Sequence, residues 1–288
     1  MDPVTMSSTI ILFREHNNWA QKFASEDPTL TDEELFKKAK TVITAMFQRI
    51  VYYEYLPALM GVPLEPHSAY DPSLNPAADP HFLNCAMVYG HSELGEVVAR
   101  VDDRMAPIPN GGLLIEDVIA QPFKYMDAGL EPVLRGLAST VQGKVDTYII
   151  DFFRGGMHQG PNRAPWRDLR DDAGSNVGTG HGTIDTKSRH IMRGRDVRLR
   201  GINTVRANLP VPLPPLNSWS DMTGDLELIE DLTAIYGHNP DDADLWVSGL
   251  VEQHVTGSNL GATWQQIIGD FFTRSRDAGR LEQFGGLL

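Results

Sequence analysis

Two segments far apart in this chain contain side chains that could together hold a metal group. The first segment ends in His91, and the second contains Asn203 and Arg206. A metal can bind one ring nitrogen of a neutral histidine, and the other ring nitrogen then needs a hydrogen-bonding partner. His91 and Asn203 could supply such a pair. His91 is therefore the candidate ligand, and the elements around it must position it.

The residues around His91 recur at helical spacing. Steps of four, three, four and three residues separate Met87, His91, Leu94, Val98 and Val101, which places them on one face of a predicted helix. From this spacing alone we favour a core histidine that is bonded to a backbone carbonyl. The rest of the sequence changes that interpretation.

Four short blocks occur in the order found in animal-type haem peroxidases, the superfamily of myeloperoxidase, peroxinectin and the cyclooxygenases. They are Arg14-Glu15-His16-Asn17, Tyr89-Gly90-His91, Arg193-Gly194-Arg195-Asp196 and Asp244-Leu245-Trp246-Val247-Ser248-Gly249-Leu250. The resemblance runs from about Ile10 to Phe284. It implies a mainly α, haem-peroxidase-like helical domain with haem b as cofactor. The implied activity is a peroxidase reaction, in which hydrogen peroxide oxidises a small electron donor.

The resemblance also implies roles for individual residues. His91 matches the histidine that coordinates haem iron, Asn203 matches the asparagine that hydrogen-bonds this histidine, and Arg206 matches an arginine that pairs with a haem propionate. The other interpretations are a local hydrogen bond at a turn for Asn203 and a solvated surface position for Arg206. We expect Arg195 and Asp196 to form an ion pair with each other that shapes their loop.

The chain departs from the family where peroxide would be activated. In relatives a distal histidine and an arginine do this work, and both positions would precede Met1. We therefore expect a domain that lacks its distal N-terminal part, with no catalytic residue and no calcium site. Val88 stands where relatives place a propionate-binding arginine or an oxidising tyrosine. The alternative function is a catalytically inactive haem-binding or interaction protein with a degenerate peroxidase fold.

Composition bears on the classes of partner and compartment. The formal net charge is −13, whereas nucleic acids and anionic membrane surfaces require a basic footprint, so no nucleic-acid partner is expected. No run approaches the roughly 18 apolar residues of a membrane span, and the N-terminal residues lack the pattern of a signal peptide. The single cysteine rules out an intrachain disulfide. The compartment is left open.

Capping and stop signals predict where the helices begin and end. Thr31 followed by Glu34 is a capping box, Gly61 is a C-terminal stop, and Pro57 indicates a kink just before it. A Pro-rich loop is predicted from about 63 to 80. Further helices are predicted near 113–126, 145–153, 220–236, 240–252 and 262–276. Asn239 with Pro240 predicts the start of the fourth of these.

We expect one partial haem peroxidase domain over residues 1–288, interrupted by a Gly-rich loop insertion at about 155–187. His158, His181 and His190 lie in or beside this insertion, and their spacing matches no compact metal site. We expect these three histidines to be solvated. The blocks that contain Arg14 and Trp246 are expected to serve packing.

Overall fold

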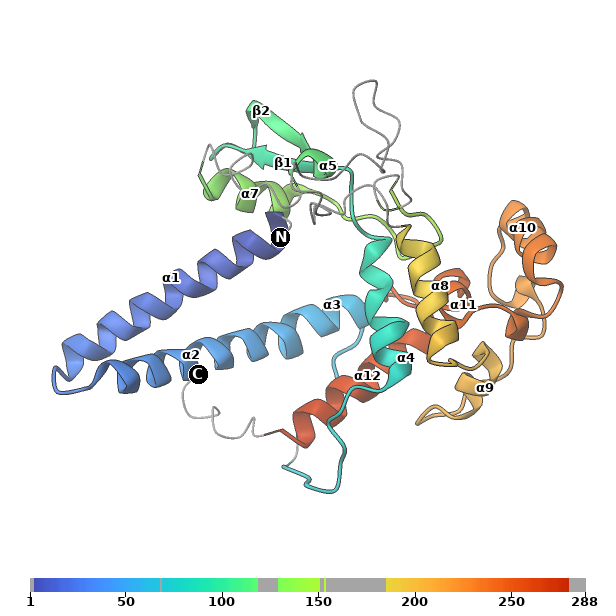
Figure 1. The fold of residues 1–288 in the computed structure, drawn as a ribbon, viewed down its shortest axis with the longest axis horizontal. Coiled ribbons are helices and arrows are strands. Elements are labelled where there is room, and N and C mark those ends of the chain that lie inside the picture. Colours follow the sequence, from blue (N-terminus) through green and yellow to red (C-terminus); the bar gives the residue numbers. More distant parts are fainter. Residues whose placement is uncertain (1–2, 68, 119–128, 151–152, 154–184, 280–288) are drawn as a thin grey trace, which may run out of the picture. The chain divides into compact units, whose positions relative to one another are not determined.

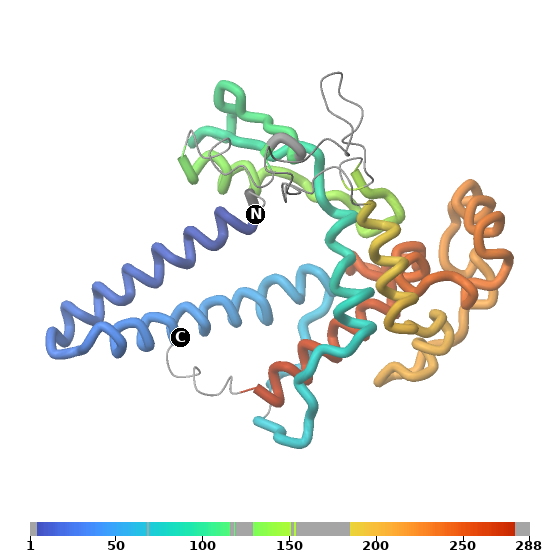
Figure 2. Tube along the Cα trace, viewed as in Figure 1, coloured from blue at the N-terminus to red at the C-terminus, as the bar shows by residue number. Residues whose placement is uncertain are grey.

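The computed structural model describes residues 3–67, 69–118, 129–150, 153 and 185–279. The chain divides into two compact units: unit 1 contains residues 1–29, 92–143 and 148–189, and unit 2 contains residues 30–91, 144–147 and 190–288. Helices dominate the described part of the chain, which confirms the mainly α prediction (Figures 1 and 2). None of the helices described has both the length and the apolar character that a bilayer crossing requires.

Unit 1 combines helices with a two-stranded antiparallel hairpin. Its elements are α1 (Pro3–Glu26), β1 (Val97–Val101), β2 (Pro107–Leu114), α5 (Ile115–Val118) and α7 (Glu131–Ser139). In the hairpin, Val97 is opposite Leu114. Helix α7 lies directly on β1. The two backbones are so close at Gly136 that a Cβ at this position would come within 1.9 Å of the Ala99 carbonyl oxygen. The absence of a side chain at Gly136 thus lets helix and strand approach closely.

Unit 2 holds the remaining elements. They are α2 (Asp32–Ile50), the π-helix η1 (Val51–Tyr55), α3 (Leu56–Met60), α4 (Pro80–Asn84), the 3-10 helix η2 (Ala86–His91), most of α8 (Thr186–Asp196), α9 (Ile202–Ala207), η6 (Trp219–Asp221), α10 (Leu226–Tyr236), η7 (Pro240–Asp242), α11 (Leu245–Val251) and α12 (Ala262–Asp277). Figure 1 shows α8 beside the segment formed by α4 and η2.

The local start and stop signals are confirmed. Thr31 caps α2, and the backbone N–H of Thr31 donates to the Glu34 carboxylate at 2.8 Å. Gly61 ends α3 in the left-handed conformation with φ +72°. Pro57 follows a π-helical turn, because its ring and missing N–H cannot continue a regular α-helix. Asn239 caps as predicted, but it caps the 3-10 turn η7, and α11 begins only at Leu245.

Two helix predictions are wrong in the described residues. The helix predicted through His91 to Val101 is instead a 3-10 helix that ends at His91, and residues 97–101 form strand β1. Valines at 97, 98 and 101 favour a strand, since their branched side chains pack well on a pleated surface. Residues 145–150 are irregular, with Ile149 buried without a helix.

Of the remaining predicted helices, the one near 113–126 is seen only as α5, since residues 119–128 lie outside the described part. The helix predicted near 220–236 becomes η6 and α10, and the one near 262–276 is confirmed as α12. Most of the Gly-rich insertion, including His158 and His181, also lies outside the described residues.

Candidate functional site

His91 ends η2 and lies against a second imidazole. Its Nδ1 atom is 2.7 Å from Nε2 of His190 on α8. The ring centroids are 4.8 Å apart and the ring planes are inclined by only 20°, so the two rings meet edge to edge through these nitrogens. His91 is half-buried, and His190 has only 4% of its surface exposed. The fold therefore joins two histidines that are 99 residues apart in the sequence.

Trp246 of α11 lies against His190. The ring centroids are 4.9 Å apart, and Trp246 is buried as the sequence predicts. Both residues line a cavity of about 230 Å³ whose wall also includes Asp244. Burial lowers the pKa of His91, because the interior disfavours an imidazolium. Burial therefore favours the neutral imidazole, which is the form that binds a metal.

The segment that carries His91 is fixed by one buried side chain just before η2 and by another within it. Tyr89 is buried, and its hydroxyl hydrogen-bonds the hydroxyl of Tyr55 in η1. Cys85 is fully buried beside Trp264, and burial raises the pKa of its thiol well above the usual range. A thiol in this state is a packing group rather than a nucleophile.

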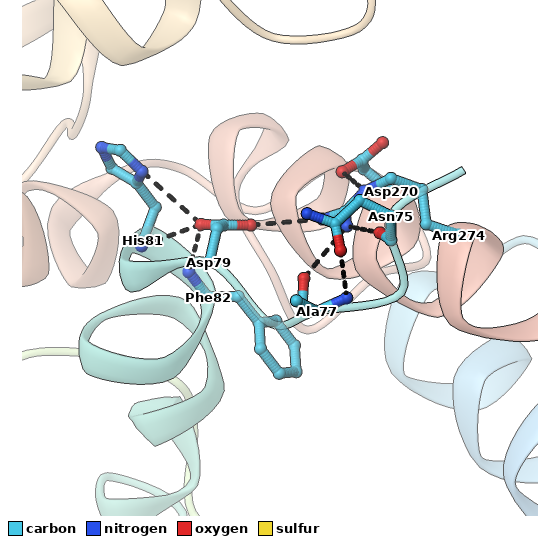
Figure 3. Close-up of polar contacts among 7 residues, drawn as sticks. All are labelled: Asn75, Ala77, Asp79, His81, Phe82, Asp270 and Arg274. Atoms are coloured by element: carbon cyan, nitrogen blue, oxygen red, sulfur yellow. Dashed lines mark hydrogen bonds and ion pairs between the residues drawn. The ribbon is translucent and has the colours of Figure 1, made fainter. Parts of the chain in front are cut away.

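The loop before α4 is fastened to α12 by Arg274 (Figure 3). The Arg274 guanidinium donates to Asp270 at 2.7 Å, to the Asn75 carbonyl at 2.6 Å and to Asp79 at 3.3 Å. Asp79 is also the N-cap of α4, and it accepts from the backbone N–H of His81 at 2.9 Å. One guanidinium thus fixes the start of the helix that leads, through η2, to His91.

Asn203 lies on α9, and its amide is bound to the backbone of Leu216. Nδ2 donates to the Leu216 carbonyl at 2.9 Å, and Oδ1 accepts from the Leu216 N–H at 2.8 Å. The two bonds close the loop that follows α9. The two polar ends of this amide are thus engaged with a nearby peptide, whereas the resemblance implies a bond to His91.

Arg206 lies in the interior of unit 2, with 7% of its surface exposed, so its interpretation as a solvated surface residue is wrong. Its guanidinium pairs with Glu252 and donates to the Thr263 hydroxyl at 3.0 Å and to the Pro214 carbonyl at 2.8 Å. Burial raises the pKa of Glu252, although Thr263 and Arg206 oppose this effect. The guanidinium that the resemblance assigns to a propionate is thus bound to groups of the protein itself.

Arg195 does not pair with Asp196, so that prediction is wrong. It forms two parallel hydrogen bonds with Asp244, each 2.8 Å long, and Tyr236 donates to the same carboxylate at 3.1 Å. Arg195 and Asp196 lie on helix α8 rather than on a loop. Adjacent residues on a helix point about 100° apart and do not face each other.

His190 is the functional candidate that sequence reasoning missed, because it was expected to be a solvated loop residue. Helix α8 is polar overall, yet Thr186 and His190 are buried, and Gly194 continues the same face one turn later. The charged side chains of Arg189 and Arg193 lie on the exposed side. This spacing of four residues was the available signal for a buried histidine.

Comparison with known proteins places this geometry in context. Residues 1–281 match the family model for animal haem peroxidase. The chain is 31% identical over 282 residues to Peroxinectin A of Dictyostelium discoideum, an alignment that covers 97% of this chain and 48% of that protein. It is 27% identical over 277 residues to thyroid peroxidase of Sus scrofa, covering 93% of this chain and 28% of that protein.

Solved structures agree with these sequence matches. Peroxidase A from Dictyostelium discoideum aligns with a TM-score of 0.82 at 31% identity, covering 97% of this chain and 50% of that one. A fatty acid alpha-dioxygenase from Oryza sativa aligns with a TM-score of 0.74 at 20% identity, covering 93% and 48%, and this match concerns the fold alone. The chain spans at most about half the length of these relatives.

Proposed function

Because the chain belongs to the animal haem peroxidase family, we propose that it serves a haem-dependent peroxidase reaction in which hydrogen peroxide oxidises a small electron donor. The observation that carries the proposal is the half-buried His91, whose Nδ1 lies 2.7 Å from Nε2 of a buried imidazole. A histidine arranged in this way suits the axial position of a haem iron. Haem b, when bound, supplies the redox chemistry of the reaction.

The residues present fit such a group on the side of the axial ligand. His91 would hold the iron of such a group through Nε2, since Nδ1 is the atom that faces His190. The elements behind His91 are held by Arg274 and by buried aromatic rings, and this limits the movement of the ligand. Peroxide activation also requires a proton acceptor and a cation on the other face of the haem. We propose that a segment or chain other than residues 1–288 supplies these two groups.

We propose indirect roles for Asn203 and Arg206. Asn203 closes the loop after α9 through Leu216, and Arg206 connects α9 to Glu252 after α11. These contacts hold α9 beside α11, the helix whose Trp246 contacts His190. Each residue would therefore influence haem binding through the position of α9 and α11 rather than by touching the cofactor.

The second candidate function is a catalytically inactive haem-binding protein. It is favoured by the engagement of Arg206 with Glu252, and by Val88, which lies three residues before His91 on a helix with about three residues per turn. That spacing places Val88 on the same face of η2 as His91, where an apolar side chain supplies neither a propionate contact nor a redox-active group. The two functions differ in peroxide turnover and not in haem binding.

The test is a haem titration of the 288-residue chain, followed by absorption spectroscopy, with His91→Ala as the variant and His238→Ala as the matched control. His238 is exposed in a turn, so its loss should leave the spectrum unchanged. We expect a one-to-one Soret shift that only His91→Ala abolishes. Peroxide-dependent oxidation of guaiacol, measured on the loaded chain together with the segment or chain that supplies the proton acceptor and the cation, would then support the peroxidase over the inactive binder. A folded chain without any shift would refute both functions.

A further inference from the structure

We propose that His190 is the positioning residue of the site: it accepts the hydrogen bond from Nδ1 of His91 and thereby selects the tautomer that presents Nε2 to the iron. The proposal rests on the proposed function for the role of the iron, and on the geometry for the hydrogen bond itself. The resemblance gives this task to Asn203, whose amide is bound to Leu216 instead.

The distance between the two nitrogens and the near-coplanar rings carry the assignment. A separation of 2.7 Å between Nδ1 of His91 and Nε2 of His190 is a hydrogen bond between two imidazoles. If Nε2 of His91 binds iron, Nδ1 must carry the proton, so Nε2 of His190 must be the acceptor. The proton of a neutral His190 then lies on its Nδ1. Binding of the iron thus fixes the protonation pattern of the whole pair.

The ring of His190 is held in place from outside the pair. Trp246 contacts it at 4.9 Å between centroids, and helix α8 is fastened to the start of α11 by the two bonds from Arg195 to Asp244. Asp244 immediately precedes α11, the helix that carries Trp246. The same two helices therefore supply the acceptor imidazole, the ring that contacts it and the ion pair that sets their spacing.

An imidazole acceptor has a chemical consequence for the ligand. A neutral nitrogen draws the proton of His91 less strongly than a carboxylate would, so the axial ligand keeps the character of an imidazole rather than an imidazolate. Loss of the acceptor should weaken the ligand further. A weaker ligand favours ferrous over ferric haem, because the ferric ion carries more positive charge.

The experiment compares His190→Leu and His190→Gln with the wild type in the haem-loaded full chain, and His238→Leu serves as the matched control. The iron–histidine stretching frequency is measured by resonance Raman spectroscopy, together with the midpoint potential and the haem affinity. For His190→Leu we expect a lower frequency, a higher potential and a loss of haem affinity on the order of 10–100-fold. Each tenfold loss of preference for ferric haem raises the potential by about 59 mV.

His190→Gln retains an acceptor oxygen and should restore part of each shift, which a purely structural role of the histidine would not predict. Unchanged frequency and potential in His190→Leu would overturn the proposal. It would also be overturned if His91→Ala kept the histidine-ligated spectrum and His190→Leu lost it, because His190 would then be the ligand itself.

A measurement without haem separates this proposal from the proposed function. Nitrogen-15 NMR of the histidine rings in the haem-free chain reports which nitrogen of His91 carries the proton. We expect the proton on Nδ1 in the wild type, and a shift of population toward Nε2 in His190→Leu. If haem never binds, the proposed function fails, yet these spectra still decide the hydrogen bond. If neither His190 variant changed the tautomer of His91, the proposed hydrogen bond from His91 to His190 would be refuted.

Discussion

Replacing Arg206 by methionine removes the positive charge that faces Glu252 inside unit 2. Arg206 and Glu252 are 7% and 6% exposed, so solvent cannot compensate the carboxylate that remains. Two bonds from Thr263 to Glu252, of 2.9 and 3.0 Å, stay in place and satisfy part of it. Breaking a buried pair from one side costs about 3–5 kcal/mol. We expect Arg206→Met to lower the free energy of unfolding of the haem-free chain by an amount toward the lower end of that range.

The assay is urea unfolding of the haem-free chain, followed by tryptophan fluorescence. Trp219, Trp246 and Trp264 are buried in unit 2, so their emission reports the unit that contains the pair. The control is the double variant Arg206→Met with Glu252→Gln. It removes both charges and should recover most of the lost stability, because no uncompensated charge is left in the interior.

Two results would refute this reasoning. If the double variant lost as much free energy of unfolding as the two single variants lose together, the two charges would not interact. An Arg206→Met chain of wild-type stability that nevertheless binds haem weakly would show that the guanidinium serves a propionate directly. The latter outcome would restore the role that the family resemblance implies.

Two further changes test the packing of unit 2 and its behaviour in acid. Gly249→Ala would place a Cβ 2.0 Å from Cε2 of the fully buried Trp264, so we expect a loss of about 1–3 kcal/mol or more in urea unfolding, and wild-type stability would contradict the packing. Arg276 and His67 hold the pKa of Asp277 below its ordinary value of 3.8. The stability that these two partners give the folded chain through the Asp277 carboxylate is present above pH 3.8, the ordinary pKa. This stability is lost as the pH falls from 3.8 through the lower pKa that Asp277 has in the folded chain. Asp277→Asn should therefore flatten the acid limb of a plot of Tm against pH between 5 and about 2, and an unchanged limb would speak against it.

The features that the sequence predicted correctly depend on contacts within a few residues. Thr31 and Glu34 bond each other's backbone, Gly61 adopts the left-handed conformation that ends α3, and Asn239 caps the turn that follows it. In each case the partner is three residues away or closer, or is the residue's own backbone. Such signals do not need the tertiary fold, so a single sequence is enough to find them.

The features that it predicted wrongly depend on distant partners. Apolar spacing after His91 suits a helix, but pairing with β2 makes residues 97–101 a strand, and that partner cannot be seen from local periodicity. Arg195 was assigned to its neighbour in the sequence, whereas Asp244 lies 49 residues away. His190 was assigned to solvent, because most side chains of α8 are polar and only its tertiary contacts reveal the buried face.

The two ion pairs near the site differ in what they contribute, and exposure decides which effect dominates. The side chain of Arg195 is 65% exposed, so its pair with Asp244 adds at most about 1 kcal/mol to stability. Its bidentate geometry nevertheless restricts the orientation of α8 against the start of α11, and hence of His190 against Trp246. The buried pair of Arg206 bears on the stability of unit 2, whereas the exposed pair of Arg195 bears on how the two imidazoles meet. A 2.7 Å contact between two rings requires a stable unit as well as a restricted orientation of its helices.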